Sequence, residues 1–146
     1  MKKIVILALL LMPFAGMAAE KGTAGLTAHN INDNRVSLKL SPRMKHRLHS
    51  NMRAQLAATR TIIGQLADGR FEKAARTARS GLGVSEAMKQ VYDASKNEDF
   101  KKLGLDSQAG AEELANTLQT KDLKESMQAL RNTMGYCVQC HDRFRQ

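Results

Sequence analysis

Apolar positions near the end of the chain repeat with the spacing of a helix. Seven positions are alternately four and three residues apart, and all but one are apolar: Leu123, Met127, Leu130, Met134, Cys137, His141 and Phe144. Because one helical turn takes about 3.6 residues, these positions share one side of a helix. The pattern predicts a long last helix, capped by Thr120, with Asp122 in its first turn.

A second stripe of the same kind follows Ser41. Ser41 is a capping residue type, and Pro42 suits the first helical position. Gly69 favours the end of a helix near Ala67. Six apolar residues fall on one side of this first helix: Met44, Leu48, Met52, Leu56, Ile63 and Leu66. Met52 lies near the middle of that side.

The rest of the chain adds helical patterns and almost no strand pattern. Residues 70–80 predict a helix stopped by "GLG", Ser85 begins a few helical turns, and residues 107–119 predict another long helical segment. We expect 96–107 to be a looser connection and 20–40 to be an extended arm. "VSLKL" at 36–40 alternates like a strand but has no evident partner. Four main helical segments predict an all-α, antiparallel four-helix bundle over 41–146, in which the first and last helices are neighbours.

The first 19 residues have the composition of a secretory signal peptide. Lys2 and Lys3 precede an apolar run, which is followed by Pro13, Gly16 and small residues. The run is too short to span a bilayer, and no later segment is more apolar, so we expect no membrane protein. Cleavage after Ala18 or Ala19 would release the rest, and we expect the periplasm as its destination.

Positive charge is concentrated in the first predicted helix. The chain carries a formal charge of +9, and no acidic residue occurs between Val36 and Ala67. Basic residues there would attract acidic partners. Nucleic acid is not expected as a partner, because the chain is exported, has only six aromatic residues and shows no nucleic-acid-binding motif.

The two cysteines of the chain lie beside a histidine in "CVQCH", where three chemistries are open. A redox disulfide would normally accompany a βαβ pattern, which is missing here. Structural zinc needs four ligands, whereas Cys137, Cys140 and His141 supply three. The third chemistry is covalent haem c, for which C-x-x-C-H is the attachment motif. Two thioethers would anchor one haem, and the imidazole would bind its iron. Export and the absence of any other cysteine favour haem.

With this motif at the end of a helical chain, the sequence resembles the class II cytochromes c, the cytochrome c prime group. The ending "CVQCHDRFR" matches the family pattern C-x-x-C-H-x-x-(Tyr/Phe)-Arg through Phe144 and Arg145. The resemblance covers roughly 41–146. It implies thioethers at Cys137 and Cys140, His141 as proximal ligand, and Arg145 near the proximal face of the haem. The family often forms dimers through its first two helices, so the resemblance allows a homodimer.

The second axial position decides the function. If the first and last helices are antiparallel neighbours, Met52 lies at the height of His141. Met44 and His49 are the other candidates, and a core methionine with no ligand role is the fourth reading. A Met/His member of the family is a one-electron carrier, for which acidic periplasmic redox proteins are the expected partners. With an apolar distal side the haem would instead be five-coordinate and bind nitric oxide or carbon monoxide. We expect no enzyme, because no acid–base pair suited to peroxide cleavage is evident.

Overall fold

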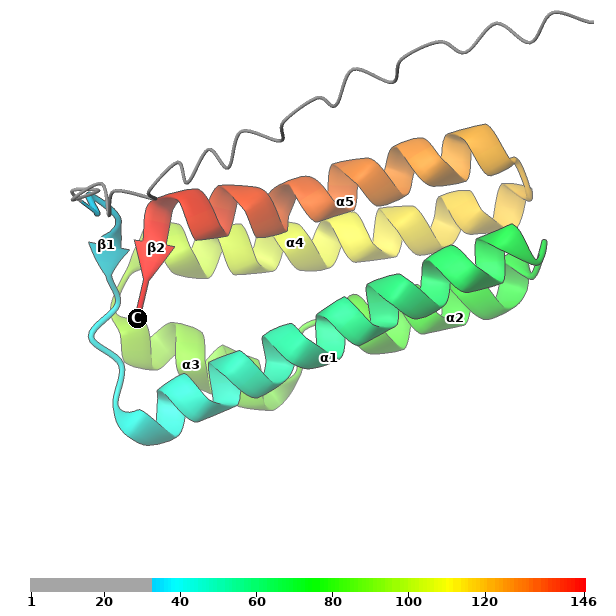
Figure 1. Ribbon diagram of the computed structural model, residues 1–146. Coiled ribbons are helices and arrows are strands. Elements are labelled where there is room, and N and C mark those ends of the chain that lie inside the picture. The colour runs from blue at the N-terminus through cyan, green and yellow to red at the C-terminus, as the bar shows by residue number, and fades with distance from the viewer. Residues whose placement is uncertain (1–32) are drawn as a thin grey trace, which may run out of the picture. The chain divides into compact units, whose positions relative to one another are not determined.

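The computed structural model describes residues 33–146, which fold almost entirely into helices (Figure 1). The predicted signal peptide and residues 20–32 of the arm lie outside this range. Five α-helices occur in the described residues: α1 (Pro42–Ala67), α2 (Phe71–Leu82), α3 (Glu86–Ser95), α4 (Glu98–Thr117) and α5 (Leu123–Arg143). A 3₁₀ turn, η1 (Leu118–Thr120), precedes α5. The all-α class is confirmed, with one helix more than the four main segments expected.

The first helix has the predicted ends. The Ser41 hydroxyl accepts a hydrogen bond from the Met44 N–H at 3.4 Å, and Pro42 is the first helical residue. Gly69 has a φ of +68°, a left-handed conformation that glycine adopts at little cost. The chain can therefore turn sharply into α2, and α1 and α2 form a hairpin.

The two glycines of the predicted "GLG" stop have different roles in α2. Gly81 remains helical, and only Gly83 ends the helix. A Cβ at position 81 would lie 2.5 Å from the Cβ of Ala58, so glycine here permits close packing of α2 on α1. Gly81 therefore serves helix packing rather than termination.

The expectation of a loose connection over 96–107 is wrong. This stretch forms the first half of α4, whose N-cap is Asn97. The Asn97 Oδ1 accepts a hydrogen bond from the Phe100 N–H at 2.9 Å. Glu98 and Asp99 then lie in the first turn, where the helix dipole favours acidic side chains. Burial of Phe100 adds the packing energy that makes this polar-looking segment helical.

Both predicted ends of the last helix also need correction. Asp122, not Thr120, caps α5, and its Oδ1 accepts from the Glu125 N–H at 2.8 Å. Lys121, between the two, has a φ of +60°, so the helix cannot begin before it. At the other end α5 stops at Arg143, and the chain continues as strand β2 (Phe144–Arg145).

The "VSLKL" segment does have a partner, contrary to expectation. Strand β1 (Val36–Ser37) pairs in parallel with β2, with Val36 opposite Phe144 and Ser37 opposite Arg145. The Leu38 N–H adds a bond to the Arg145 carbonyl at 2.9 Å. Residues 36–38, which precede α1, are thereby fixed to the C-terminal end of α5 (Figure 1).

Two clusters of buried side chains hold the helices together. One is rich in alanine and joins α1, α2, α4 and α5 through residues such as Ile62, Ala75 and Leu114. We call it the alanine core. The other lies around α3 and the start of α4; its members include Leu48, Tyr92, Phe100 and Phe144, and we call it the aromatic core. The small side chains of the alanine core let α2 pack closely on α4, whereas α1 and α5 make few direct contacts.

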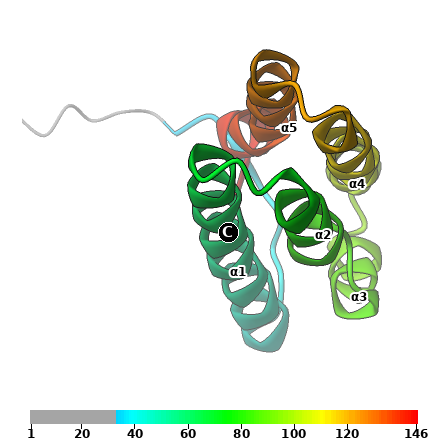
Figure 2. The same ribbon diagram turned by 90° about the vertical axis from the view of Figure 1, so that its right-hand side faces the viewer.

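Contrary to expectation, the first and last helices do not pack directly on each other. The main packing partners are α1 with α2 and α4 with α5, as the view along the helices illustrates (Figure 2), and α2 also packs on α4. Direct contact between α1 and α5 is sparse. These two helices face each other across a cavity instead.

Among the described residues, no helix combines the length and the apolar character that crossing a membrane requires.

Candidate functional site

A cavity of about 330 Å³ lies between α1 and α5 and reaches α3 and α4. Its volume is at the lower end of the range of roughly 300–1,000 Å³ that is typical of ligand pockets. Apolar and aromatic side chains make up most of its walls, including Leu48, Leu56, Met88 and Phe100. Such a lining suits a large, flat, mainly apolar group.

The C-x-x-C-H motif forms the α5 wall of this cavity. Cys137, Cys140 and His141 all line it, together with Met134 and Tyr136. Positions three and four residues apart lie one above the other on a helix, so both thiols and the imidazole reach the same space. Both cysteines are free thiols. The donor set and the apolar walls fit a haem held by two thioethers and one imidazole.

The thiols do not have the character of a redox pair. Burial, and secondarily the neighbouring Cys137, raises the pKa of the Cys140 thiol to about 11. A catalytic C-x-x-C pair works through a lowered pKa. Although Cys137, Cys140 and His141 line one cavity, no group of three or more His, Cys, Asp or Glu side chains in residues 33–146 has the arrangement of a metal-ion site.

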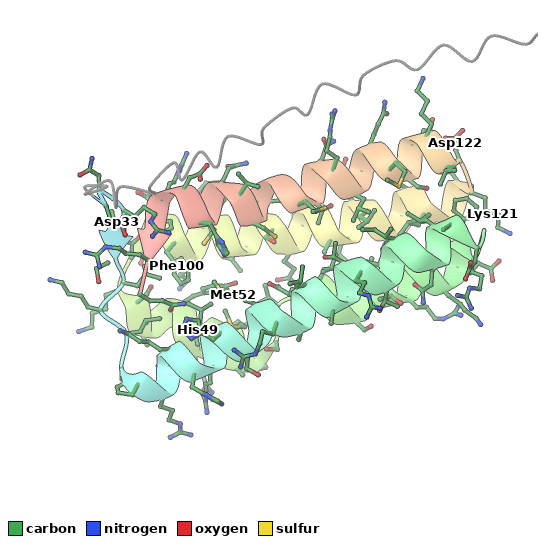
Figure 3. The ribbon with its side chains drawn as sticks, viewed as in Figure 1. Asp33, His49, Met52, Phe100, Lys121 and Asp122 are labelled. Atoms are coloured by element: carbon green, nitrogen blue, oxygen red, sulfur yellow. The ribbon has the colours of Figure 1, made fainter. Side chains whose placement is uncertain are left out.

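The opposite wall belongs to α1 and contains Met52. Met52 is half-buried and lies on the side of α1 that faces α5 (Figure 3). Of the other candidates, Met44 packs against the aromatic core and does not line the cavity. His49 is exposed and does not line it either. Met52 and His141 therefore approach one cavity from opposite helices.

The remaining walls contain residues that the sequence did not single out. Tyr92 from α3 and Phe100 from α4 are buried, and their rings meet edge to face with centroids 5.3 Å apart. Phe100 packs in the same way on Phe144, at 5.4 Å. Burial, and secondarily Cys140, raises the pKa of Tyr92 to about 12. A neutral phenol thus forms part of the wall.

Glycines on α4 make room for the two tyrosines of the cavity. A Cβ at Gly104 would lie 2.3 Å from the Cζ of Tyr92, and one at Gly110 would lie 2.5 Å from the Cε2 of Tyr136. Gly110 lies in a predicted helical segment, where an isolated glycine often indicates close packing, whereas Gly104 falls in the stretch that was expected to be a connection.

Arg145 is not in the position that a continuous helix would give it. It belongs to β2, is exposed, and does not line the cavity. Its Nε lies 3.6 Å from an oxygen of Asp33. Because α5 ends at Arg143, Arg145 does not lie on a helical turn that follows His141.

A different arginine contacts the motif. Arg35 donates a hydrogen bond from Nη1 to the carbonyl oxygen of His141, at 3.2 Å. The same guanidinium binds both carboxylate oxygens of Asp33, at 2.8 and 2.9 Å. These bonds lower the pKa of Asp33 to about 2. Local sequence patterns could not reveal this contact, because it joins residues 106 positions apart.

Helix α1 is strongly basic, and one of its arginines lies at the cavity. Five basic residues of α1 have no side-chain ion pair within the described part of the chain: Arg43, Lys45, Arg47, Arg53 and Arg60. Arg53 is exposed and lines the cavity. Because α1 contains no acidic residue, its positive field is not neutralised along the helix itself.

A family model described as Cytochrome C' matches residues 39–145, a range that includes α1, α5 and the complete motif. No curated protein and no solved structure gives a significant match to the chain.

Proposed function

The chain belongs to the cytochrome C' family, which makes it a haem c protein, and we propose that it works as a periplasmic one-electron carrier. In this proposal one haem is held by Cys137 and Cys140, with His141 and Met52 as axial ligands. The observation that carries it is the position of Met52 and His141 on opposite walls of one cavity. The predicted signal peptide, about 19 residues long, would direct the chain to the periplasm and be cleaved off. The exported chain would receive its haem there.

Each wall of the cavity would contribute to holding the group. The two thiols would become thioethers, and the imidazole of His141 would be the proximal ligand. Around them α1, α2, α4 and α5 would serve as the four helices of an antiparallel bundle. When bound, the haem supplies an iron that alternates between two oxidation states by one electron.

The side chains on the α1 wall would set the character of that iron. A methionine thioether stabilises Fe(II) and raises the reduction potential. The buried Leu48 beside it would exclude water and lower the local dielectric, which also tunes the potential. With both axial positions filled, no coordination site stays open for a substrate, so the proposed role is not enzymatic.

Optical spectroscopy of the haem-loaded protein tests this assignment. We expect a low-spin spectrum in both oxidation states, with a weak methionine-to-iron band at the red end of the visible spectrum in the oxidised form. Carbon monoxide should leave the reduced spectrum unchanged. Met52→Ala should give a high-spin reduced spectrum that shifts on addition of carbon monoxide.

Met44→Ala is the matched control, because Met44 is on the same helix but outside the cavity lining. It should keep the wild-type spectrum. A wild-type protein that is high-spin and binds carbon monoxide would contradict the carrier role and favour the gas-binding alternative. Mass measurement of the protein should first show one haem added to the polypeptide, since unmodified thiols would contradict covalent attachment.

We further propose that the basic residues of α1 recruit an acidic redox protein. Arg53 lies at the cavity, where an electron would leave or enter. Unpaired basic side chains on the same helix would steer a negatively charged partner to this opening. Electron transfer needs only a brief encounter, which long-range attraction accelerates without tight packing.

A further inference from the structure

The last turn of α5 depends on the N-terminal arm for one of its hydrogen bonds. The final carbonyls of a helix have no N–H partner within the helix. Here the Cys140 carbonyl still accepts from the Phe144 N–H. Beyond it the backbone is extended, so the carbonyl of His141 has no helical donor, and Arg35 supplies one at 3.2 Å.

The guanidinium of Arg35 is itself held in place. Two hydrogen bonds fix it to Asp33, which also lies beside Arg145, near β2 (Figure 3). The pairing of β1 with β2 fixes the backbone that carries Arg35. An exposed arginine normally moves among many rotamers, whereas this one is restrained at both its backbone and its head group.

We propose that Arg35 is a positioning residue for the axial histidine. By binding the carbonyl of His141, it fixes the peptide that carries the imidazole and keeps the last turn of α5 helical. Its positive charge, next to the ligand, opposes oxidation of the iron to Fe(III). The inference rests on the proposed function, because it takes His141 as an iron ligand.

The test compares Arg35→Gln with Arg143→Gln in the haem-loaded protein. Arg143 is exposed in the last turn of α5, and among residues 33–146 it makes no ion pair or side-chain hydrogen bond. The two variants therefore lose the same charge near the same helix end, but only the first loses the bond to His141. Two quantities are measured: the midpoint potential, and the hydrogen exchange of the backbone amides from Cys140 to Phe144.

We expect Arg35→Gln to lower the midpoint potential more than Arg143→Gln does. The amides of the last turn should exchange about tenfold faster in Arg35→Gln, because a hydrogen bond from a charged donor is lost. Arg143→Gln should leave the exchange rates at the wild-type values. Equal changes in the two variants would overturn the proposal, since the lost charge alone would then explain them.

Two charge-conserving variants separate the effect of the hydrogen bond from the effect of the charge. Arg35→Lys keeps the charge but cannot reproduce the forked contacts with Asp33 and His141. Its exchange rates should exceed those of Arg143→Lys, and this comparison decides the proposal if Arg35→Gln yields no loaded protein. If the wild type itself carries no haem, the proposed function fails. If haem is attached and Arg35 variants match their controls, only the inference fails.

Discussion

The phenol ring of Tyr92 lies against the backbone of Gly104, so that a Cβ at position 104 would come within 2.6 Å of the Tyr92 hydroxyl oxygen. This contact joins α3 to α4 at the cavity. Tyr92 is buried and packs edge to face on Phe100. Its ring therefore has little freedom to move away from a larger residue at position 104.

Gly104→Ala should destabilise the protein, although alanine normally favours a helix. The new methyl group would overlap the ring, and overpacking of this kind costs about 1–3 kcal/mol. Urea denaturation would measure the loss in free energy of unfolding.

Gly64→Ala is the matched control for this change. Gly64 is also helical, but no atom lies within 4 Å of the position its Cβ would take. Alanine should therefore stabilise α1 by roughly 0.5–1 kcal/mol. If both substitutions stabilise, the tight contact of Tyr92 with Gly104 does not exist in solution.

A second prediction concerns a hydroxyl group without a partner. Ser126 of α5 is completely buried, and its Oγ makes no hydrogen bond. Ser126→Ala removes this unsatisfied group, so the free energy of unfolding should stay the same or rise by up to about 1 kcal/mol. Thr133→Val provides the contrast, because Thr133 donates to the Gly110 carbonyl at 3.1 Å. That variant should lose about 0.5–1.5 kcal/mol; a loss for Ser126→Ala instead would mean that its hydroxyl has a partner.

The helices that the sequence predicted well are those with strong local signals. α1 has a serine cap, a proline and a terminal glycine, and its ends agree with the prediction. α4 lacks an apolar start, and its first half depends on burial of Phe100 and on the glycine that admits Tyr92. These are tertiary contacts, which local patterns do not reveal. The end of α5 was missed for the same reason, because β1 fixes it from the other end of the domain.

The candidate site also combines residues that have a local sequence signal with residues that only tertiary contacts bring together. Cys137, Cys140 and His141 could be recognised as a candidate site because the motif occupies five consecutive residues. The choice of Met52 as a candidate rested on helix periodicity, and the structure brings Met52 to the same cavity even though α1 and α5 are not packed neighbours. The strand that contains Arg145 could not be expected from the helical spacing that precedes it. The contact of Arg35 with His141 depends on chain pairing and could not be predicted.

A third prediction follows from the ion pair of the arm. Hydrogen bonds from Arg35 lower the pKa of Asp33 from 3.8 to about 2. Above the ordinary value the carboxylate is ionised in both the folded and the unfolded chain, and its stabilising effect is complete. As the pH falls from about 4 to about 2, the unfolded chain takes up the proton first, so this stability is progressively lost. Urea denaturation across that pH range should detect the loss.

Asp33→Asn removes the titrating group and should flatten this part of the pH dependence. Asp106→Asn is the control, because it removes an exposed ion pair with Lys102 on α4, away from the arm. Its curve should keep the wild-type slope more closely than that of Asp33→Asn. The same slope in wild type and Asp33→Asn would show that the arm is not held by this carboxylate.

The last prediction concerns the basic residues of α1, and small redox reagents can test it before any protein partner is known. Hexacyanoferrate(III), a trianion, should oxidise the reduced protein more slowly in Arg53→Gln than in the wild type. At low ionic strength we expect a decrease of about twofold to tenfold, because one attractive charge beside the cavity is lost. Arg76→Gln makes the same charge change on α2, outside the cavity lining, and should have a smaller effect.

Stopped-flow measurements at increasing salt should bring the three rates together, since the Debye length falls below about 10 Å above 0.1 M. A cationic oxidant should reverse the order of the variants. If Arg53→Gln and Arg76→Gln slow the reaction equally, net charge controls the encounter, and α1 has no special role in it.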